Sequence, residues 1–275
     1  MLRGVLTVAG LIAAYAFLIE PRRLVVRRHD VALDAWPERL DGMVVACVSD
    51  LHTGAPHVKR SRVRRVVERT NRLRPDLVAL LGDFVDRDVR GSRREPPEAV
   101  AEELARLAAP AVAVLGNHDW SSEGSRMAEA LHGAGITVLE DAATRVDGVH
   151  VAGVGDLRER GADIAAALET VPAGEPVLLL SHDPDVFPGV PDRVALTLSG
   201  HTHGGQVDIP RLRARFIPSR FGDRYARGVI RERGRTLFVT SGIGTSGWPV
   251  RLLRPPEIAL LTLRAAGGPG AAPSG

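Results

Sequence analysis

Cysteine, lysine and aromatic residues are scarce in this 275-residue sequence. The single cysteine, Cys47, excludes disulfide bonds within the chain and metal sites built from several thiolates. Lys59 is the only lysine among the 36 basic residues, and the others are arginine. Aromatic residues make up 4% of the chain and no basic run alternates with them, so the sequence lacks a base-stacking surface and no nucleic acid partner is expected.

Length and the order of apolar segments indicate one catalytic domain of the α/β class. We place it at residues 22–264, between an apolar N-terminal segment (1–21) and a Gly- and Pro-rich tail (265–275) that is typical of disorder. Apolar periodicity predicts the helices, and apolar runs predict the strands. The expected helices are 58–73, 96–108, 125–133 and 162–170, and the expected strands outside the motifs are 24–31, 149–154, 237–240 and 258–263.

The N-terminal segment is apolar enough to enter a membrane. Residues 4–19 carry no charge and span about 24 Å as a helix, close to the minimum for crossing a bilayer. Ala14-Tyr15-Ala16 resembles a signal cleavage site, but the apolar Phe17-Leu18-Ile19 that follow favour an uncleaved, single-pass anchor in the cell membrane. Arginines after the segment outnumber the one before it, which favours a cytoplasmic catalytic domain, although the side of the membrane stays open.

Five apolar runs are each followed at once by a short polar motif. The runs are continuous and rich in Val, Leu and Ala, which predicts strands buried on both faces. The runs are 43–48, 77–81, 111–115, 177–180 and 194–198, and the motifs are Ser49-Asp50-Leu51-His52, Gly82-Asp83-Phe84-Val85-Asp86, Gly116-Asn117-His118-Asp119, Ser181-His182-Asp183 and Gly200-His201-Thr202-His203. Each motif therefore follows the carboxyl end of a strand, where open α/β sheets bind their ligands.

The side chains in these motifs are oxygen and nitrogen donors that suit Mn, Fe or Zn. In Asp50-Leu51-His52 the i, i+2 spacing directs both side chains to one side of an extended segment, and His201-Thr202-His203 repeats it. Asp83 has two carboxylate oxygens and can bridge two ions, whereas Asn117 and His182 offer neutral ligands for the second. One such motif alone is also typical of a turn or a helix N-cap, but five in succession favour a two-metal site.

These motifs, in this order and with every ligand position filled, resemble the signature of the calcineurin-like metallophosphoesterases. Segments 204–206, 218–222, 225–228 and 241–247 are similar to the membrane-anchored bacterial branch of that family, the YaeI/YkuE-like group. The resemblance covers the chain from about Leu24 to Leu263. It implies a two-sheet βαββα sandwich with flanking helices, preceded here by the N-terminal apolar helix.

The resemblance also implies a role for each motif residue. One ion would be held by Asp50, His52, Asp83 and His203, and a second by Asp83, Asn117, His182 and His201. His118 would be a catalytic residue that binds no metal and donates to the leaving oxygen or to the phosphoryl oxygens. Asp86 would pair with His118 and fix its orientation. The implied cofactors are two divalent or mixed-valence ions of Mn, Fe or Zn.

The implied activity is hydrolysis of a phosphate ester. Two cations about 3.5–4 Å apart lower the pKa of a bound water enough to form hydroxide near neutral pH, and this metal-bound hydroxide attacks without a protein nucleophile. We predict a phosphodiesterase whose substrate is a phosphorylated lipid headgroup or a nucleotide-linked lipid. The alternative is a tethered phosphodiesterase or phosphomonoesterase that acts on a soluble substrate.

An arginine-rich segment, residues 210–227, is the feature that favours a lipid substrate. Its arginines are Arg211, Arg213, Arg215, Arg220, Arg224 and Arg227. They lie beside apolar side chains in a hairpin-like pattern suited to a bilayer surface, where each basic residue contributes about 1 kcal/mol. The alternative is a solvated surface in an arginine-rich chain. The sequence indicates no oligomeric state.

Overall fold

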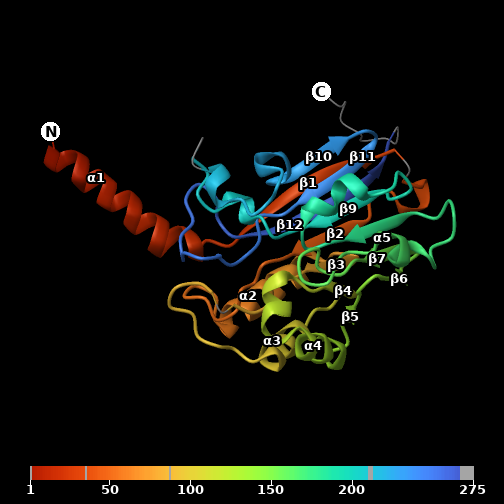
Figure 1. Cartoon of the computed structure of the whole chain (residues 1–275), viewed down its shortest axis with the longest axis horizontal. Coiled ribbons are helices and arrows are strands. Elements are labelled where there is room, and N and C mark those ends of the chain that lie inside the picture. Colours follow the sequence, from red (N-terminus) through yellow and green to blue (C-terminus); the bar gives the residue numbers. More distant parts are fainter. Residues whose placement is uncertain (1, 35, 87, 210–212, 267–275) are drawn as a thin grey trace.

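The computed structural model describes residues 2–34, 36–86, 88–209 and 213–266. In this part of the chain, two β-sheets of six strands each pack face to face, and helices cover their outer faces (Figure 1). The predicted two-sheet α/β sandwich is therefore confirmed. The N-terminal helix α1 (Leu2–Ala14) projects away from the sandwich (Figure 1).

The first sheet is mainly parallel. Its order is β1-β12-β2-β3-β4-β5, and β12 with β2 is the one antiparallel pair among its described strands. The strands are β1 (Val25–Leu33), β2 (Val44–Val48), β3 (Leu77–Leu81), β4 (Ala111–Val114), β5 (Thr137–Val138) and β12 (Glu257–Ala265). Because β2, β3 and β4 are parallel, the motifs that follow them meet at one edge of the sheet.

The second sheet, in the order β10-β11-β9-β8-β7-β6, has a parallel centre and an antiparallel strand at each edge. The strands are β6 (Ala142–Val146), β7 (Val149–Gly153), β8 (Val177–Leu180), β9 (Leu196–Ser199), β10 (Gly228–Glu232) and β11 (Arg235–Val239). The two remaining motifs follow the adjacent parallel strands β8 and β9. They are therefore neighbours at the carboxyl edge of this sheet.

Alternate side chains of the strands fill three apolar layers. In β2, Val45 and Cys47 belong to the core between the sheets, whereas Ala46 and Val48 belong to the core under the helices. The outer face of the first sheet is covered by α2 (Arg60–Leu73), α3 (Pro97–Leu104) and α4 (Asn117–Gly133), and that of the second by α5 (Ile164–Leu168). Each buried Val or Leu contributes about 1.5–3 kcal/mol to the stability of the fold, so these layers hold the ends of the strands in place.

Several elements differ from the predicted ones. Helix α4 begins at Asn117 rather than at residue 125, because the Asp119 carboxylate accepts the Gly116 N–H and caps the helix directly after β4. Strands β5, β6 and β10 are not among the predicted strands, since β5 has two residues and the other two are edge strands with partly exposed side chains. Ala265 belongs to β12 rather than to a disordered tail, and residues 267–275 lie outside the described residues.

The described part of the arginine-rich segment, residues 213–227, is not a hairpin. Its described residues form two short 3-10 turns, Arg213–Phe216 and Gly222–Tyr225. Arg211 lies outside the described residues. The reason lies in local pairing: Arg213 donates to the carboxylates of Asp208 and Asp223, which draws the segment into turns instead of extended strands.

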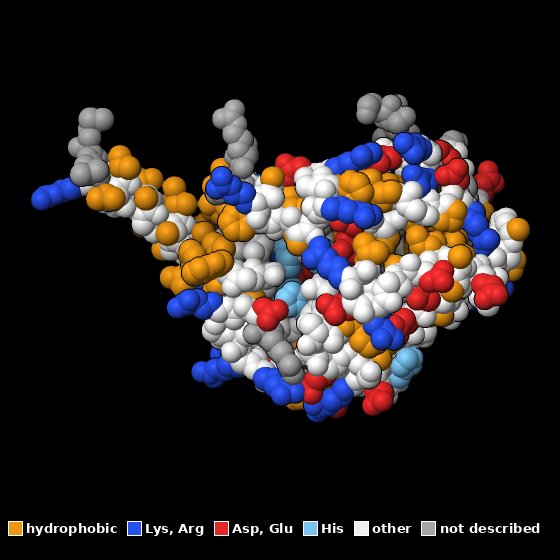
Figure 2. Space-filling model, viewed as in Figure 1, with side chains coloured by type: hydrophobic (Ala, Val, Ile, Leu, Met, Phe, Trp, Pro, Cys, Tyr) orange, Lys and Arg blue, Asp and Glu red, His pale blue; other side chains and the backbone are white. Residues whose placement is uncertain are grey.

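Helix α1 leads to a foot, residues 15–22, that contacts the sandwich through Ala16 and Glu20. It continues into a π-helical turn (Tyr15–Ile19) and a 3-10 turn (Glu20–Arg22), and residues Arg3–Arg22 are long and apolar enough to cross a membrane. Along the helix the apolar side chains are exposed, as for Leu11 at 66%, and they form the orange arm in Figure 2. At the foot, the buried Glu20 carboxylate accepts the Leu253 N–H at 2.9 Å.

Candidate metal centre

The seven predicted metal ligands meet at the carboxyl ends of the two sheets. They are Asp50 and His52 after β2, Asp83 after β3, Asn117 after β4, His182 after β8, and His201 and His203 after β9. All are buried except Asn117, which is half-buried. Figure 2 shows histidine side chains recessed near the middle of this face of the molecule.

Asp50, His52 and His203 form a first group of potential ligands. One ligand atom from each lies within 4.8 Å of the others. His203 Nε2 is 3.2 Å from His52 Nε2 and 3.5 Å from Asp50 Oδ1. Tetrahedral ligands placed about 2.1 Å from a zinc ion are about 3.4 Å from one another, so these separations suit three donors around one ion.

Asp83, His182 and His201 form a second group of the same kind. His182 Nε2 is 3.2 Å from Asp83 Oδ2 and 3.1 Å from His201 Nδ1. Nearby, the buried Oδ1 atom of Asn117 has no hydrogen-bond partner among the described residues. An unpaired buried oxygen costs about 1–3 kcal/mol, so this amide oxygen fits a metal ligand better than a structural group.

Asp83 connects the two groups. Its Oδ2 atom lies 3.4 Å from His52 Nε2 and 3.2 Å from His182 Nε2. Its Oδ1 atom accepts the backbone N–H of His118 at 3.0 Å, which fixes the carboxylate plane. The carboxylate therefore has the position that a bridging ligand needs.

The backbone is left-handed at five of these residues. The φ angles are +52° at Asp50, +45° at His52, +57° at Asp83, +67° at His201 and +51° at His203. Such conformations cost about 1–3 kcal/mol each and cluster where function requires them. Backbone hydrogen bonds hold the turns in place; for example, His52 N–H donates to the Asp83 carbonyl at 2.9 Å. The turns direct alternate side chains into one centre.

Three of the imidazoles are oriented through the ring nitrogen that faces away from the centre. His52 Nδ1 is 3.1 Å from Asp86 Oδ1, His182 Nδ1 donates to the Leu81 carbonyl at 2.7 Å, and His201 Nε2 donates to the Pro218 carbonyl at 3.2 Å. A proton held on one nitrogen leaves the other as a lone-pair donor, so each neutral ring presents a nitrogen that can bind metal.

Asp86 contacts His52 rather than His118, which corrects the predicted pairing. Its carboxylate also accepts hydrogen bonds from the Val89 N–H and the Ser92 hydroxyl, and these contacts turn it toward the buried ring of His52. His118 Nδ1 instead lies 3.1 Å from Oδ2 of Asp88, two residues further along the same loop. Asp86 therefore supports a predicted metal ligand, and Asp88 supports the predicted catalytic histidine.

The electrostatics of the centre favour the metal-binding forms of Asp83, His201 and His203 but hold a proton on His182. Burial, reinforced by His182, holds the pKa of His201 well below its ordinary value, and burial reinforced by His52 does the same for His203. Burial alone would raise the pKa of Asp83, but His182 and His52 outweigh burial and hold that pKa well below the usual range. The pKa of His182 is well above its ordinary value because Asp83 outweighs burial, so a metal ion there would displace a proton.

Two supporting residues escape the sequence analysis. Asp119 is fully buried and accepts the N–H groups of Asp83 at 2.8 Å, Phe84 at 2.9 Å and Gly116 at 3.0 Å. Burial, and then the Asp83 charge, raises the pKa of Asp119 to about 7. Its only signal in the sequence is its place in the third motif. The second residue, Arg251, carries no motif signal, yet it is fully buried and donates to the carbonyls of Ser241 and Gly244.

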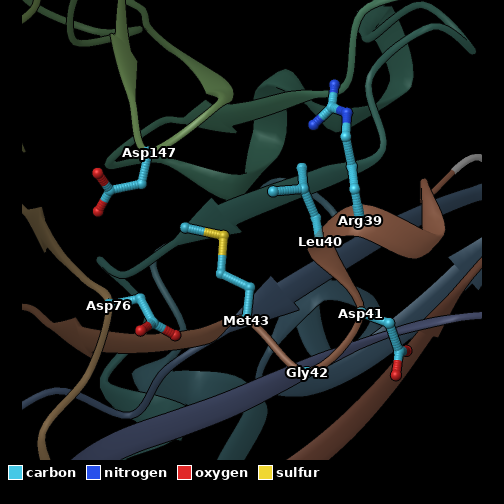
Figure 3. Close-up of a pocket in the computed structure, with 7 residues that line it drawn as sticks. All are labelled: Arg39, Leu40, Asp41, Gly42, Met43, Asp76 and Asp147. Atoms are coloured by element: carbon cyan, nitrogen blue, oxygen red, sulfur yellow. The ribbon is translucent and has the colours of Figure 1, made fainter.

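A second set of acidic side chains lies at the opposite, amino ends of the strands. A pocket of about 410 Å³ is lined there by Arg39, Leu40, Asp41, Gly42, Met43, Asp76 and Asp147 (Figure 3). Asp76 precedes β3 and accepts the Val44 N–H at 2.7 Å. The lining contains no histidine, and none of the predicted metal ligands contributes to it.

Two groups of buried donors that share one carboxylate define the class of dinuclear metal hydrolases. A profile of the calcineurin-like phosphoesterase family matches residues 43–205, and the chain belongs to this family. It is therefore a metal-dependent phosphoesterase with a dinuclear His/Asp site. The family resemblance seen in the sequence is thereby confirmed.

Three relatives resemble the chain over nearly its whole length. A transmembrane protein with metallophosphoesterase domain from Danio rerio is 31% identical over 286 residues, which cover 97% of this chain and 62% of that protein. The uncharacterized metallophosphoesterase YkuE of Bacillus subtilis (strain 168) is 29% identical over 95% of this chain and 92% of its own length. Phosphodiesterase YaeI of Escherichia coli (strain K12) is 31% identical over 90% and 92%.

Proposed function

We propose that the chain is a phosphodiesterase that uses two metal ions held by the seven ligand residues. The observation that carries this proposal is the Asp83 carboxylate, whose Oδ2 atom lies 3.4 Å from His52 Nε2 and 3.2 Å from His182 Nε2. One carboxylate shared by two histidine-containing groups fits two adjacent ions. The name of the relative YaeI, a phosphodiesterase, supports a diester rather than a monoester substrate.

The proposed ligand sets follow the two groups. One set is Asp50, His52, Asp83 and His203, and the other is Asp83, Asn117, His182 and His201. Ions of Mn, Fe or Zn suit these oxygen and nitrogen donors. Ions bound there would lower the pKa of a water molecule, so that it could lose a proton and act as the nucleophile, and would stabilise negative charge on the phosphoryl oxygens. Asp86 and Asp119 keep the ligands in place through His52 and the Asp83 backbone.

His118 is the proposed proton donor to the leaving oxygen. Its side chain is 14% exposed, at the rim of the centre, and its ring lies edge-on to His52 with 4.8 Å between ring centroids. The Asp88 carboxylate, 3.1 Å from Nδ1, orients the ring, which leaves Nε2 free to face the leaving oxygen. Asp88 is 65% exposed, so solvent weakens its influence.

A membrane-bound phosphodiester is the proposed substrate class. Hydrogen bonds join the foot of α1 to the metal centre in three steps. The Ala16 carbonyl accepts the Arg251 N–H at 3.1 Å, Arg251 Nη2 donates to the Gly244 carbonyl at 2.6 Å, and Gly244 N–H donates to the Asp50 carbonyl at 2.6 Å. If α1 anchors the chain in the cell membrane, these contacts hold the centre at a fixed height above a lipid headgroup or a nucleotide-linked lipid.

The arginine-rich segment supports a lipid substrate less than the sequence predicted. Arg224 pairs with Glu232 at 2.6 Å, Arg213 pairs with Asp223 at 3.0 Å, and Arg227 pairs with Asp208 at 2.6 Å, so three of its cations already have an acidic partner. Arg215 is exposed and has no ion pair among the described residues. This internal pairing favours the alternative, a tethered enzyme that acts on a soluble phosphodiester or monoester.

Two substrate comparisons test the proposal with the full chain. We expect kcat/KM for bis-p-nitrophenyl phosphate to exceed that for p-nitrophenyl phosphate about tenfold or more, and the reverse order would contradict a diesterase. Phosphatidylglycerol in nanodiscs and its deacylated, soluble form then present the same diester. Faster hydrolysis of the lipid supports a membrane substrate, and equal or faster hydrolysis of the soluble form favours the alternative.

A further inference from the structure

A strongly basic pocket lies at the foot of α1, outside the metal centre. Its volume is about 270 Å³, and its lining is Arg22, Pro56, His57, Lys59, Ser61, Arg62 and Arg65. Four of these seven residues are cations and none is an acid. Because the like charges of neighbouring cations repel one another, a pocket of this composition is stabilised by an anion.

The amino end of helix α2 contributes to the same pocket. Lys59 precedes the helix without capping it through its side chain, and the first turn contains no acidic residue. The end of a helix with free N–H groups carries a partial positive charge, so cations are ordinarily unfavourable there and an anion is favourable. Arg60 pairs with Glu102 and Arg64 pairs with Glu103, but neither carboxylate lines the pocket.

Arg62 provides an independent sign of a ligand. This residue is only 6% exposed, and its Nη1 donates to the Arg22 carbonyl at 2.8 Å. Its Nε and Nη2 atoms are buried and have no hydrogen-bond partner among the described residues. Burial, and then the neighbouring Arg65 and Arg69, lowers the pKa of Arg62 to about 10. A buried guanidinium without a counter-charge is costly. Arg62 therefore needs a negative partner, which the lining of the pocket does not supply.

We propose that this pocket binds the phosphate group of a phosphorylated ligand. Phosphate matches the lining because it offers several acceptor oxygens to arginine, lysine, hydroxyl and helix N–H donors. The volume is several times the roughly 30 Å³ of a water molecule, so a phosphate with part of its substituent fits. No predicted metal ligand lines the pocket, so the site is separate from the metal centre and does not depend on the proposed function.

The position of the pocket indicates how it meets a phospholipid. Arg22 closes the apolar stretch Arg3–Arg22, so the pocket lies where that helix would leave a bilayer. The Pro249 carbonyl, 3.2 Å from His57 Nε2, connects the pocket to a loop whose Trp248 and Leu253 are exposed. Exposed tryptophan is typical of the headgroup level of a membrane. A lipid headgroup and a free phosphate share the same chemistry, and the experiment separates them.

Lys59 allows a test that reports on this pocket alone, because it is the only lysine in the chain. The full chain is treated with an amine-acylating reagent, and acylation of Lys59 is followed by mass spectrometry against a lysine peptide in the same tube. The samples are detergent micelles with inorganic phosphate or chloride at equal ionic strength, and nanodiscs of phosphatidylcholine with or without phosphatidylglycerol. We expect phosphate or phosphatidylglycerol to slow acylation about fivefold or more.

The source of the anion follows from which arm protects Lys59. Protection by inorganic phosphate assigns a soluble ligand, and protection only in phosphatidylglycerol nanodiscs assigns a lipid headgroup. Arg65→Gln, in the pocket, should remove most of the protection, whereas Arg72→Gln, the same change in the last turn of α2, should leave it intact. Absence of protection in both arms, or equal loss in the two variants, would overturn the proposal.

Discussion

The two ends of the same sheets carry acidic side chains of opposite character. At the carboxyl ends, Asp50 and Asp83 are buried beside imidazoles in left-handed turns. At the amino ends, Asp76 and Asp147 are exposed around a pocket without histidine, and Asp76 accepts a backbone N–H. Carboxylates beside a strand therefore do not make a metal site by themselves. Burial and neighbouring imidazoles make the difference, whereas a left-handed backbone does not, because Asp147 also has a φ of +45°.

Replacing the shared carboxylate should have the largest effect. Asp83→Ala removes a ligand from both proposed sets, so we expect loss of both ions and a fall in kcat/KM on the order of 10³-fold or more, beyond the 10–100-fold typical of outer-shell changes. Metal analysis and turnover of bis-p-nitrophenyl phosphate measure both quantities. Asp76→Ala, the matched change at the other end of β3, should leave both within about twofold. Two ions retained in Asp83→Ala would rule out bridging.

Removing the proposed proton donor should have the next largest effect. His118→Asn should retain the metals and lower kcat about 10²-fold or more for an alkyl phosphodiester, with a smaller loss for a nitrophenyl ester, which needs little protonation. Asp88→Asn should give a milder version of the same pattern, because Asp88 is the partner of His118. Equal losses on the two substrates would move His118 to stabilisation of the phosphoryl oxygens.

Asp86→Asn tests the corrected pairing. Because Asp86 orients His52, the change should weaken metal affinity about 10–100-fold while the ratio of rates on good and poor leaving groups stays constant. A metal titration followed by kinetics at saturating metal separates these effects. Unchanged affinity together with an altered leaving-group dependence would restore the original pairing of Asp86 with His118.

Glu103 is a buried carboxylate that is paired with arginines rather than with imidazoles. Its replacement should have the smallest effect. Arg64 first, and then Arg60, overcome burial and lower the pKa of Glu103 to about 2. The stabilisation is therefore complete above the ordinary pKa near 4.5 and is lost as pH falls toward 2. Its arginine partners are largely exposed, so we expect Glu103→Gln to cost only about 1 kcal/mol at pH 7.

Denaturant titrations between pH 3 and pH 7 measure this contribution. The Glu103→Gln variant should lose the part of the acid-dependent stability that Glu103 supplies. The neighbouring Glu102→Gln, which changes an exposed pair with Arg60, should cost less than about 0.5 kcal/mol. An equal cost for the two variants would show that burial of Glu103 adds nothing to its ion pairs.

The strands of the centre and the grouping of its donor side chains could be predicted, because buried parallel strands are continuous apolar runs and each run ends in a motif. The pairing of Asp86 and Asp88 could not, because both lie in one loop and the choice depends on distant contacts such as the Ser92 hydroxyl. Strands β6 and β10 lie at the edges of the sheet and have partly exposed side chains. Their sequences therefore lack the continuous apolar run that marks a strand buried on both faces. Arg62 and Arg251 resemble surface arginines until the fold buries them.

The number of metal ions bound per chain tests the central claim most directly. Metal-free full chain is titrated with Mn²⁺ while calorimetry counts the sites and electron paramagnetic resonance reports on their separation. We predict two ions per chain whose spins are coupled, because one carboxylate joins the two ligand groups. A single ion, or two ions without spin coupling, would contradict a dinuclear centre bridged by Asp83.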